Sequence, residues 1–161
     1  MSDLKVAVMM GSKSDLPIME ETANILKDFG VGYEMKVLSA HRTPKETAEY
    51  AEDLRKRGFK VVICGAGASA ALSGVVAAHT TLPVIGVPID ATSLNGMDAL
   101  LSTVQMPPGV PVGAVAIGKP GAQNAALLAL RILGTENSEI AKKLEEYKQK
   151  QRQKILDISL N

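Results

Sequence analysis

The chain has 161 residues, of which 46% are hydrophobic, and its 18 basic and 17 acidic residues leave a net charge of +1. This length supports one domain over residues 1–161 and is too short for two ordinary domains. The balanced charge and the 3% content of aromatic residues argue against nucleic-acid binding, which depends on basic surfaces and stacking platforms.

The amino-terminal segment, residues 1–5, leads into a short apolar run that is neither a signal peptide nor a membrane span. We therefore expect a cytoplasmic protein that does not bind membranes. Cys64 is the single cysteine, so no internal disulfide is expected. The two histidines, His41 and His79, form no cluster with metal-ligand spacing, and we expect no metal site.

The first strand–helix unit begins with the apolar run Val6-Ala7-Val8-Met9-Met10, which is typical of a strand buried on both faces. The polar turn Gly11-Ser12-Lys13-Ser14-Asp15 follows, and Pro17 opens a predicted helix to about residue 29, with Asp15 or Ser14 as its cap. This order aims free N–H groups above the strand, near the Ser12 and Ser14 hydroxyls. It indicates either an anion site or a capped turn without a ligand.

The second unit is a predicted strand over residues 33–38, followed by the motif Ser39-Ala40-His41-Arg42-Thr43-Pro44. Thr43, Pro44 and Glu46 fit a capping box at the start of a predicted helix over residues 44–57. Capping does not explain the other two polar residues of the motif. His41 can carry a proton near neutrality, and Arg42 offers donors suited to phosphate or carboxylate, so the pair indicates a site for a small anionic ligand.

The third unit is a predicted strand over residues 60–64, followed by residues 65–74, which carry so few large side chains that backbone must approach something closely. We expect Cys64 to be a buried strand residue, because no base adjoins it in sequence. The stretch from Gly65 to Ala70, with Asp90 further along, also resembles a dinucleotide-binding fingerprint. That fingerprint usually opens the first strand–helix unit of its fold, so the dinucleotide interpretation is disfavoured.

The remaining patterns predict strands over residues 82–87 and 112–117 and helices over residues 95–104, 122–133 and 136–158, with a stiff proline-rich loop over residues 105–111. Residues 113–119 match a P-loop pattern as far as its lysine, but Pro120 stands where a magnesium-binding serine or threonine belongs. The apolar stripe of the last helix could pack on its own domain or on another subunit.

Five strands that alternate with helices predict an α/β fold: a three-layer, doubly wound parallel sheet of the flavodoxin-like order 2-1-3-4-5, with an extra carboxyl-terminal helix after a core of about residues 4–134. In this order the ligand crevice opens where strands 1 and 3 diverge. The turn at residues 11–15, the stretch at residues 65–74 and the loop with His41 and Arg42 all end there. We therefore predict one site at this edge.

Six motifs, which follow one another in order between about residues 6 and 133, resemble those of the PurE family, which includes the N5-carboxyaminoimidazole ribonucleotide mutases of purine biosynthesis. They are Met10-Gly11-Ser12-Lys13-Ser14-Asp15, Ser39-Ala40-His41-Arg42-Thr43-Pro44, Gly65-Ala66-Gly67, Asn95-Gly96-Met97-Asp98, Val104-Gln105-Met106-Pro107-Pro108-Gly109 and Asn124-Ala125-Ala126-Leu127-Leu128-Ala129.

The resemblance implies an isomerase that moves a carboxylate from the exocyclic nitrogen of a ribonucleotide to ring carbon 4, without a metal or an organic cofactor. Carbon dioxide would be released, held and recaptured, and His41 would act as general acid and then as general base. The resemblance also implies a homo-octamer. The residues that would bind the ribonucleotide are Ser12, Asp15 and Arg42, with Ser14, Ser39, Gly65, Ala66 and Gly67 around them.

One departure from the family pattern lies at Ala70-Ala71-Leu72-Ser73-Gly74, where the histidine of the usual mutase falls on Ala71 and its proline on Ser73. This reading resembles the related class that carboxylates aminoimidazole ribonucleotide directly with carbon dioxide, which would make the enzyme a lyase. Arg42 and residues 87–117 follow the mutase pattern, so we favour the mutase. A noncatalytic nucleotide- or flavin-binding module is an alternative of another class.

Overall fold

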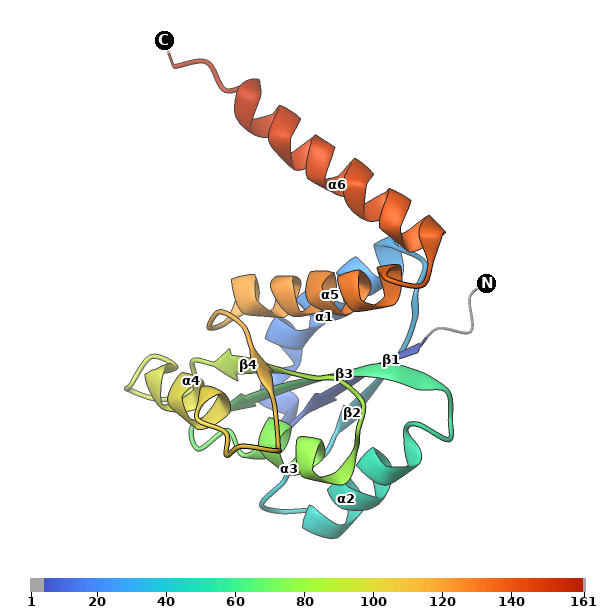
Figure 1. Ribbon diagram of the computed structural model, residues 1–161. Coiled ribbons are helices and arrows are strands. Elements are labelled where there is room, and N and C mark those ends of the chain that lie inside the picture. The colour runs from blue at the N-terminus through green and yellow to red at the C-terminus, as the bar shows by residue number, and fades with distance from the viewer. Residues whose placement is uncertain (1–4, 161) are drawn as a thin grey trace.

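The computed structural model describes residues 5–160, in which five parallel strands form one sheet (Figure 1). The order β2-β1-β3-β4-β5 confirms the predicted doubly wound arrangement. Residues 1–4, where the predicted lead-in to the first strand begins, lie outside the described residues. The strands are β1 (Lys5–Met10), β2 (Gly32–Val37), β3 (Phe59–Gly67), β4 (Val84–Ile89) and β5 (Gly113–Ala114).

Helices cover both faces of the sheet, because successive side chains of the central strand β1 point to opposite faces (Figure 1). Val6 and Val8 belong to a core shared with α1 (Leu16–Asp28) and α5 (Lys119–Gly134). Ala7 and Met9 belong to a second core. The helices that pack into this second core are α2 (Pro44–Asp53) and α3 (Leu72–His79).

The segment after β4 contains α4 (Met97–Val104) and a shorter fifth strand than predicted. Only Gly113 and Ala114 pair with β4 as a strand, although the pattern indicated residues 112–117. The chain follows β4 further through separate hydrogen bonds, from the N–H of Val115 to Gly86 O (3.2 Å) and from the N–H of Gly118 to Pro88 O (2.9 Å). The proline-rich loop before β5 therefore leads into a short edge strand.

Several further element ends differ from the predictions: β4 lies two residues later than predicted, and α5 begins at Lys119, three residues earlier. The α2 helix ends at Asp53 instead of about residue 57, and hydrogen-bonded turns lead from there to Gly58, which lies in the left-handed region (φ +83°). In addition, β3 continues to Gly67, three residues beyond the predicted end. The consequence of the longer β3 for the site is described below.

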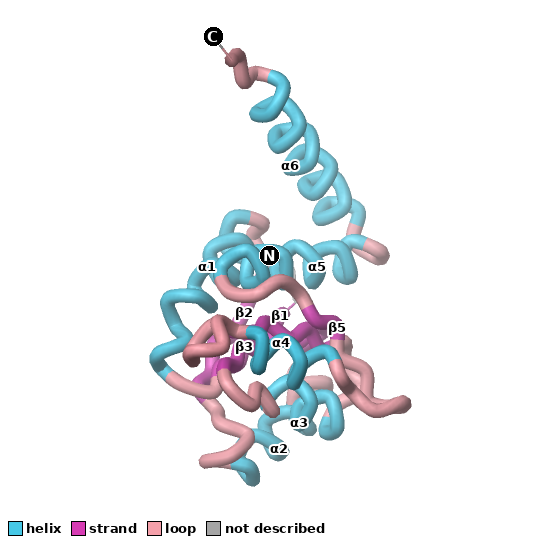
Figure 2. The backbone as a smooth tube through the Cα atoms, turned by 90° about the vertical axis from the view of Figure 1, so that its left-hand side faces the viewer, coloured by secondary structure: helices cyan, strands magenta, loops and turns pink. Residues whose placement is uncertain are grey.

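The carboxyl-terminal helix α6 (Ser138–Leu156) confirms the predicted appended helix. Its first half is fixed to the body: Ile140 is buried, the Lys143 ammonium donates to Phe29 O at 2.8 Å, and the Tyr147 ring lies 6.0 Å from the Phe29 ring. Its second half projects away from the body with every residue exposed (Figure 2). This chain thus leaves the end of α6 uncovered.

Within residues 5–160, no helix combines the length and the apolar character that crossing a membrane requires.

Candidate functional site

Hydrogen bonds join the ends of β1, β2 and β3, as the predicted crevice requires. The N–H of Gly11 donates to Gly65 O on β3 at 3.2 Å. On the other side, the N–H of Leu38 donates to Met10 O at 2.9 Å, and the guanidinium Nη2 of Arg42 donates to Gly11 O at 2.8 Å. The three segments singled out in the sequence therefore meet at one edge of the sheet.

The turn after β1 forms a capping box of its own. A short 3-10 helix, η1 (Lys13–Asp15), starts at Ser12, whose Oγ accepts from the N–H of Ser14 at 3.3 Å, while Asp15 Oδ2 accepts from the N–H of Ser12 at 3.0 Å. Ser14 also donates its hydroxyl to Ser12 Oγ at 2.9 Å. Asp15 stands at the N-cap of α1, as predicted, but its side chain makes no cap hydrogen bond to that helix, because its carboxylate accepts from Ser12 one turn earlier.

Asp15 is the buried acid of this turn, with 5% of its surface exposed. Burial raises the pKa of its carboxyl above the usual 3.8, and the Ser12 N–H and the charge of Arg42 oppose this shift. Oδ2 receives the Ser12 N–H, which leaves Oδ1 available to a ligand hydroxyl.

The loop after β2 departs from the predicted capping box. Thr43 precedes α2, but its side chain makes no cap hydrogen bond to the helix. Its Oγ1 instead accepts from the N–H of Ser39 at 2.9 Å and donates to Ser39 O at 3.1 Å. Loop closure competes with helix capping for the single hydroxyl, and loop closure prevails here.

His41 and Arg42 are both exposed beside this closed loop. Arg42 is held by Gly11 O and by Ser39 Oγ, which accepts from its backbone N–H at 3.2 Å and from its Nε at 3.4 Å. The imidazole of His41 has no hydrogen bond or ion pair to any residue in the described range 5–160. It is therefore available to a substrate.

The glycine-rich segment is part of a strand, which corrects the prediction that it forms a loop from residue 65. Gly65, Ala66 and Gly67 pair with β4. A Cβ at Gly65 would collide with the side chain of Met19 from α1, and one at Gly67 would lie 2.6 Å from Ala91 Cβ. The close approach predicted for these glycines is thus made to the protein's own α1 helix and to the loop after β4.

The connecting loop is confined to residues 68–71, and two of its residues are strained. Ala68 and Ala70 have positive φ values of 53° and 36°, a backbone conformation that residues other than glycine rarely adopt. Ala71, where the family histidine falls, stands at the N-cap of α3, and Ser73 is buried within that helix. The departure from the family pattern therefore spans the end of the loop after β3 and the first turn of α3.

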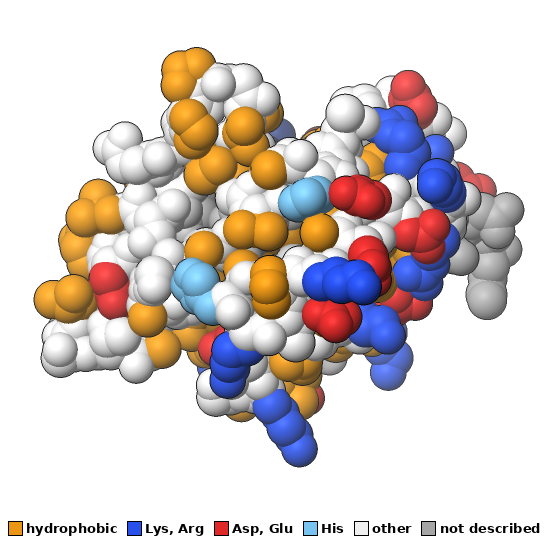
Figure 3. Space-filling model, turned by 90° about the horizontal axis from the view of Figure 1, so that it is seen from below, with side chains coloured by type: hydrophobic (Ala, Val, Ile, Leu, Met, Phe, Trp, Pro, Cys, Tyr) orange, Lys and Arg blue, Asp and Glu red, His pale blue; other side chains and the backbone are white. Residues whose placement is uncertain are grey.

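The second histidine lies elsewhere. His79 ends α3, and its Nδ1 is 2.9 Å from Glu52 Oε1 of α2. Figure 3 shows the two pale blue histidine side chains apart from each other on the face formed by α2 and α3. His79 therefore does not join the candidate site.

Among residues 5–160, no group of three or more His, Cys, Asp and Glu side chains could hold a metal ion. Cys64 is buried, and burial raises the pKa of its thiol above the ordinary range, which opposes the thiolate that nucleophilic chemistry needs.

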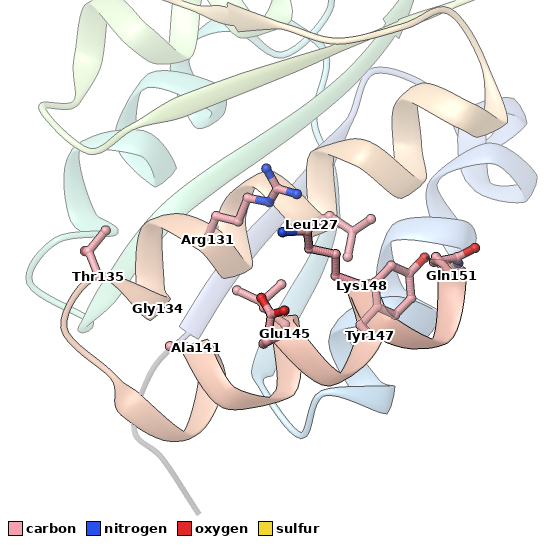
Figure 4. A pocket seen from close by; sticks show the side chains of 10 residues that line it. Leu127, Arg131, Gly134, Thr135, Ala141, Glu145, Tyr147, Lys148 and Gln151 are labelled. Carbon is pink, nitrogen blue, oxygen red and sulfur yellow. Dashed lines mark hydrogen bonds between the residues drawn. The ribbon is translucent and has the colours of Figure 1, made fainter. Parts of the chain in front are cut away.

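The groove between α5 and α6 contains none of the predicted site residues. Leu127 and Arg131 of α5 face Tyr147 and Lys148 of α6 across it (Figure 4). Its lining combines apolar side chains, among them Leu127 and Leu144, with the charged side chains of Arg131, Glu145 and Lys148. It is a surface feature separate from the sheet edge.

Sequence patterns did not identify Met19 as the partner of Gly65 or Thr43 as the residue that closes the His41 loop. Met19 has the helical spacing of any core residue, which says nothing about the strand it meets. For Thr43, the capping-box pattern masked an alternative, namely that Thr43 Oγ1 bonds back to the backbone four residues earlier.

Comparison with known proteins identifies the family. The model of the AIR carboxylase family matches residues 5–154. The N5-carboxyaminoimidazole ribonucleotide mutase of Saccharolobus solfataricus is 55% identical over 156 residues, covering 97% of this chain and 98% of that protein. The protein of the same name from Pyrococcus abyssi is 58% identical over 145 residues, covering 90% of this chain and 82% of that protein.

Among solved structures, PurE from Treponema denticola matches with a TM-score of 0.86 and 33% identity, covering 96% of this chain and 95% of that chain. The match confirms that the observed order of strands is that of a PurE protein. The resemblance seen in the motifs is thereby confirmed, and this chain belongs to the AIR carboxylase family.

Proposed function

We propose that this chain is an N5-carboxyaminoimidazole ribonucleotide mutase, an isomerase of purine biosynthesis with its active site at the ends of β1, β2 and β3. The observation that carries the site is the hydrogen bond from Arg42 to Gly11 O, which brings the loop of His41 over the end of β1. The reaction is the one that the names of its relatives at 50–58% identity give.

His41 is the proposed acid and base. As the bond between the exocyclic nitrogen and the carboxylate carbon breaks, its electron pair stays on nitrogen, and the His41 imidazolium donates a proton there. The enamine carbon 4 of the ring then forms a bond to the carbon dioxide held beside it. The proton on carbon 4 returns to the imidazole, which restores the acid. An imidazole nitrogen can both donate and accept a proton, which is what the two transfers require.

The substrate-binding roles follow the polar groups that the fold leaves available. Arg42 uses Nη2 for Gly11 O and keeps further N–H donors for the phosphate. Asp15 Oδ1 is placed to accept from a ribose hydroxyl, and Ser12 and Ser14 carry hydroxyls at the same turn. We further propose that Ser39 supports Arg42 and that the backbone of Gly65, Ala66 and Gly67 lines the floor under the imidazole ring.

A direct aminoimidazole ribonucleotide carboxylase is the second candidate, and the residue at position 71 favours it. The N-cap of α3 carries only a methyl group there, where the usual mutase has an imidazole. A methyl group neither donates a hydrogen bond to a carboxylate nor moves a proton. Retention of carbon dioxide would then depend on the rest of the site.

Turnover of two substrates separates these candidates. Purified protein is given either N5-carboxyaminoimidazole ribonucleotide alone, or aminoimidazole ribonucleotide with bicarbonate, and formation of the carbon-linked carboxylate is followed. Turnover of the first at low concentration supports the mutase. Efficient turnover of only the second would make the enzyme a carboxylase, and binding without turnover of either would leave a noncatalytic module.

We also propose a homo-octamer of one-domain, cytoplasmic subunits. The apolar side chains at the end of α6, together with the groove between α5 and α6, give copies of this chain complementary surfaces. An unpaired thiol such as that of Cys64 is usual in a reducing compartment. Light scattering with size exclusion tests the assembly, and a monomer would contradict it.

A further inference from the structure

The hydroxyl of Thr43 closes the loop that carries His41. It accepts from the N–H of Ser39 at 2.9 Å and donates to Ser39 O at 3.1 Å, and the N–H of Thr43 also donates to Ser39 O at 2.9 Å. Three hydrogen bonds between Ser39 and Thr43 thus span the loop. These bonds fix the two ends of the loop and thereby restrict the backbone of the residues between them, which include His41.

This closure extends to Arg42 through the side chain of Ser39. Ser39 Oγ accepts from both the backbone N–H and the Nε of Arg42, and the same guanidinium reaches Gly11 O. The imidazole of His41 has no partner of its own in the described residues 5–160. The position of His41 therefore depends on the shape of the loop.

Thr43 is itself fixed from the core. Its carbonyl oxygen accepts from the N–H of Thr47 at 3.0 Å and from the Thr47 hydroxyl at 2.8 Å. Thr47 is fully buried. A continuous path of hydrogen bonds thus runs from the buried face of α2 through Thr43 to Ser39 and Arg42.

We propose that Thr43 is a positioning residue for His41 and Arg42, acting through the backbone and side chain of Ser39. The inference rests on the proposed function, in which His41 transfers protons and Arg42 binds the phosphate. Displacing a catalytic group by about 1 Å costs on the order of 100-fold in rate, so a loop that opens loses activity although both side chains remain.

Three substitutions test this role on N5-carboxyaminoimidazole ribonucleotide, at a temperature where circular dichroism shows each variant folded. Thr43→Val keeps the shape but removes the hydroxyl, and Thr43→Ser keeps the hydroxyl. Thr103→Val is the matched control, since it removes a buried threonine hydroxyl that bonds to Ala99 O at 2.7 Å in α4. Thr43→Ala serves where the valine variant does not fold.

We expect kcat/KM of Thr43→Val to fall about tenfold to 100-fold, with kcat lowered and KM raised together, because both His41 and Arg42 are displaced. Thr43→Ser should stay within a few-fold of the wild type, as should Thr103→Val. Loss of folded protein alone would lower kcat and leave KM unchanged. An unchanged Thr43→Val, or a Thr43→Ser as impaired as Thr43→Val, would overturn the proposal.

Amide hydrogen exchange of the unliganded protein gives a readout that does not depend on turnover. The Ser39 and Arg42 amides should exchange at least tenfold faster in Thr43→Val, while the amide of Ile63 in β3 keeps its rate. If the wild type turns over neither N5-carboxyaminoimidazole ribonucleotide nor aminoimidazole ribonucleotide with bicarbonate, the proposed function fails. The exchange rates alone then decide whether Thr43 holds the loop. Unchanged exchange would refute that role.

Discussion

The guanidinium Nη2 of Arg42 donates a 2.8 Å hydrogen bond to the carbonyl oxygen of Gly11, which joins the loop after β2 to the end of β1. The charge of Arg42 is thereby placed beside the turn that carries the Ser12 and Ser14 hydroxyls. A phosphate bound by this arginine would lie within reach of the same turn. The hydrogen bond therefore holds the two segments side by side, as the proposed binding site requires.

Replacing Arg42 by lysine should weaken substrate binding, because lysine is a point charge without the planar fork that holds both Gly11 O and a phosphate. Loss of a charged hydrogen bond costs about 1.5–3 kcal/mol, which corresponds to an affinity lower by about tenfold to 100-fold. Calorimetric titration measures this. Arg55→Lys, which alters an exposed arginine bonded to Thr81 at 2.8 Å, is the control, and equal affinities of the two variants would contradict the assignment.

Gly65→Ala should destabilise the fold, since the new methyl group collides with the Met19 side chain. Overpacking of this kind costs about 1–3 kcal/mol in the free energy of unfolding, measured by urea denaturation. Gly113→Ala is the control, because the nearest atom to its new methyl group is Val84 O at 3.8 Å. A Gly65→Ala variant as stable as the wild type but unable to bind substrate would instead assign this glycine to the ligand.

Asp15→Asn should change the pH dependence of stability. A carboxyl whose pKa is raised in the folded state binds its proton more tightly there than in the unfolded chain, so ionisation of Asp15 lowers the free energy of unfolding as the pH rises above 3.8. Asparagine removes this contribution and keeps an oxygen to accept the Ser12 N–H.

The free energy of unfolding of Asp15→Asn minus that of the wild type should therefore increase between about pH 4 and pH 7. Urea denaturation of both proteins across this range measures the difference, in which the contributions of other groups cancel. A difference that stays constant or decreases with pH would show that burial does not raise the pKa of the Asp15 carboxyl in the folded protein.

The double variant Ile155→Lys/Ile158→Lys should lower the mass of the assembly. These two residues are 69% and 62% exposed, so charging them removes little buried apolar surface from a single copy. A subunit contact at the end of α6 would lose the apolar surface that it buries there. Light scattering measures the mass. Gln149→Lys/Gln153→Lys adds the same charge at exposed polar positions of α6, and an equal effect of the two double variants would exclude a specific apolar contact.

The sheet order was predictable because each apolar run ends in a turn rich in glycine or polar residues, and five such units at this length fit the flavodoxin-like order. The meeting of residues 11–15, the His41 loop and β3 followed from that order alone. The helix ends and the ends of β3 and β5 did not follow, since local propensity competes with pairing to neighbouring strands.

The site was predictable at the level of segments but not of individual contacts. Gly65 and Gly67 indicated close approach correctly, yet the pattern did not show that Met19 and Ala91 approach them. Thr43 fitted a capping box, and only tertiary structure shows that its hydroxyl bonds back to Ser39. Such choices between competing hydrogen-bond partners depend on where the chain folds.

The most direct test of the central claim compares His41→Asn with the wild type in turnover of N5-carboxyaminoimidazole ribonucleotide and in affinity for it. Asparagine keeps a polar side chain of similar reach but cannot donate and regain a proton near neutrality. Turnover should fall by about 100-fold to 10,000-fold, while the dissociation constant stays within a few-fold. Turnover within a few-fold of the wild type would show that another group moves the proton and would contradict the account.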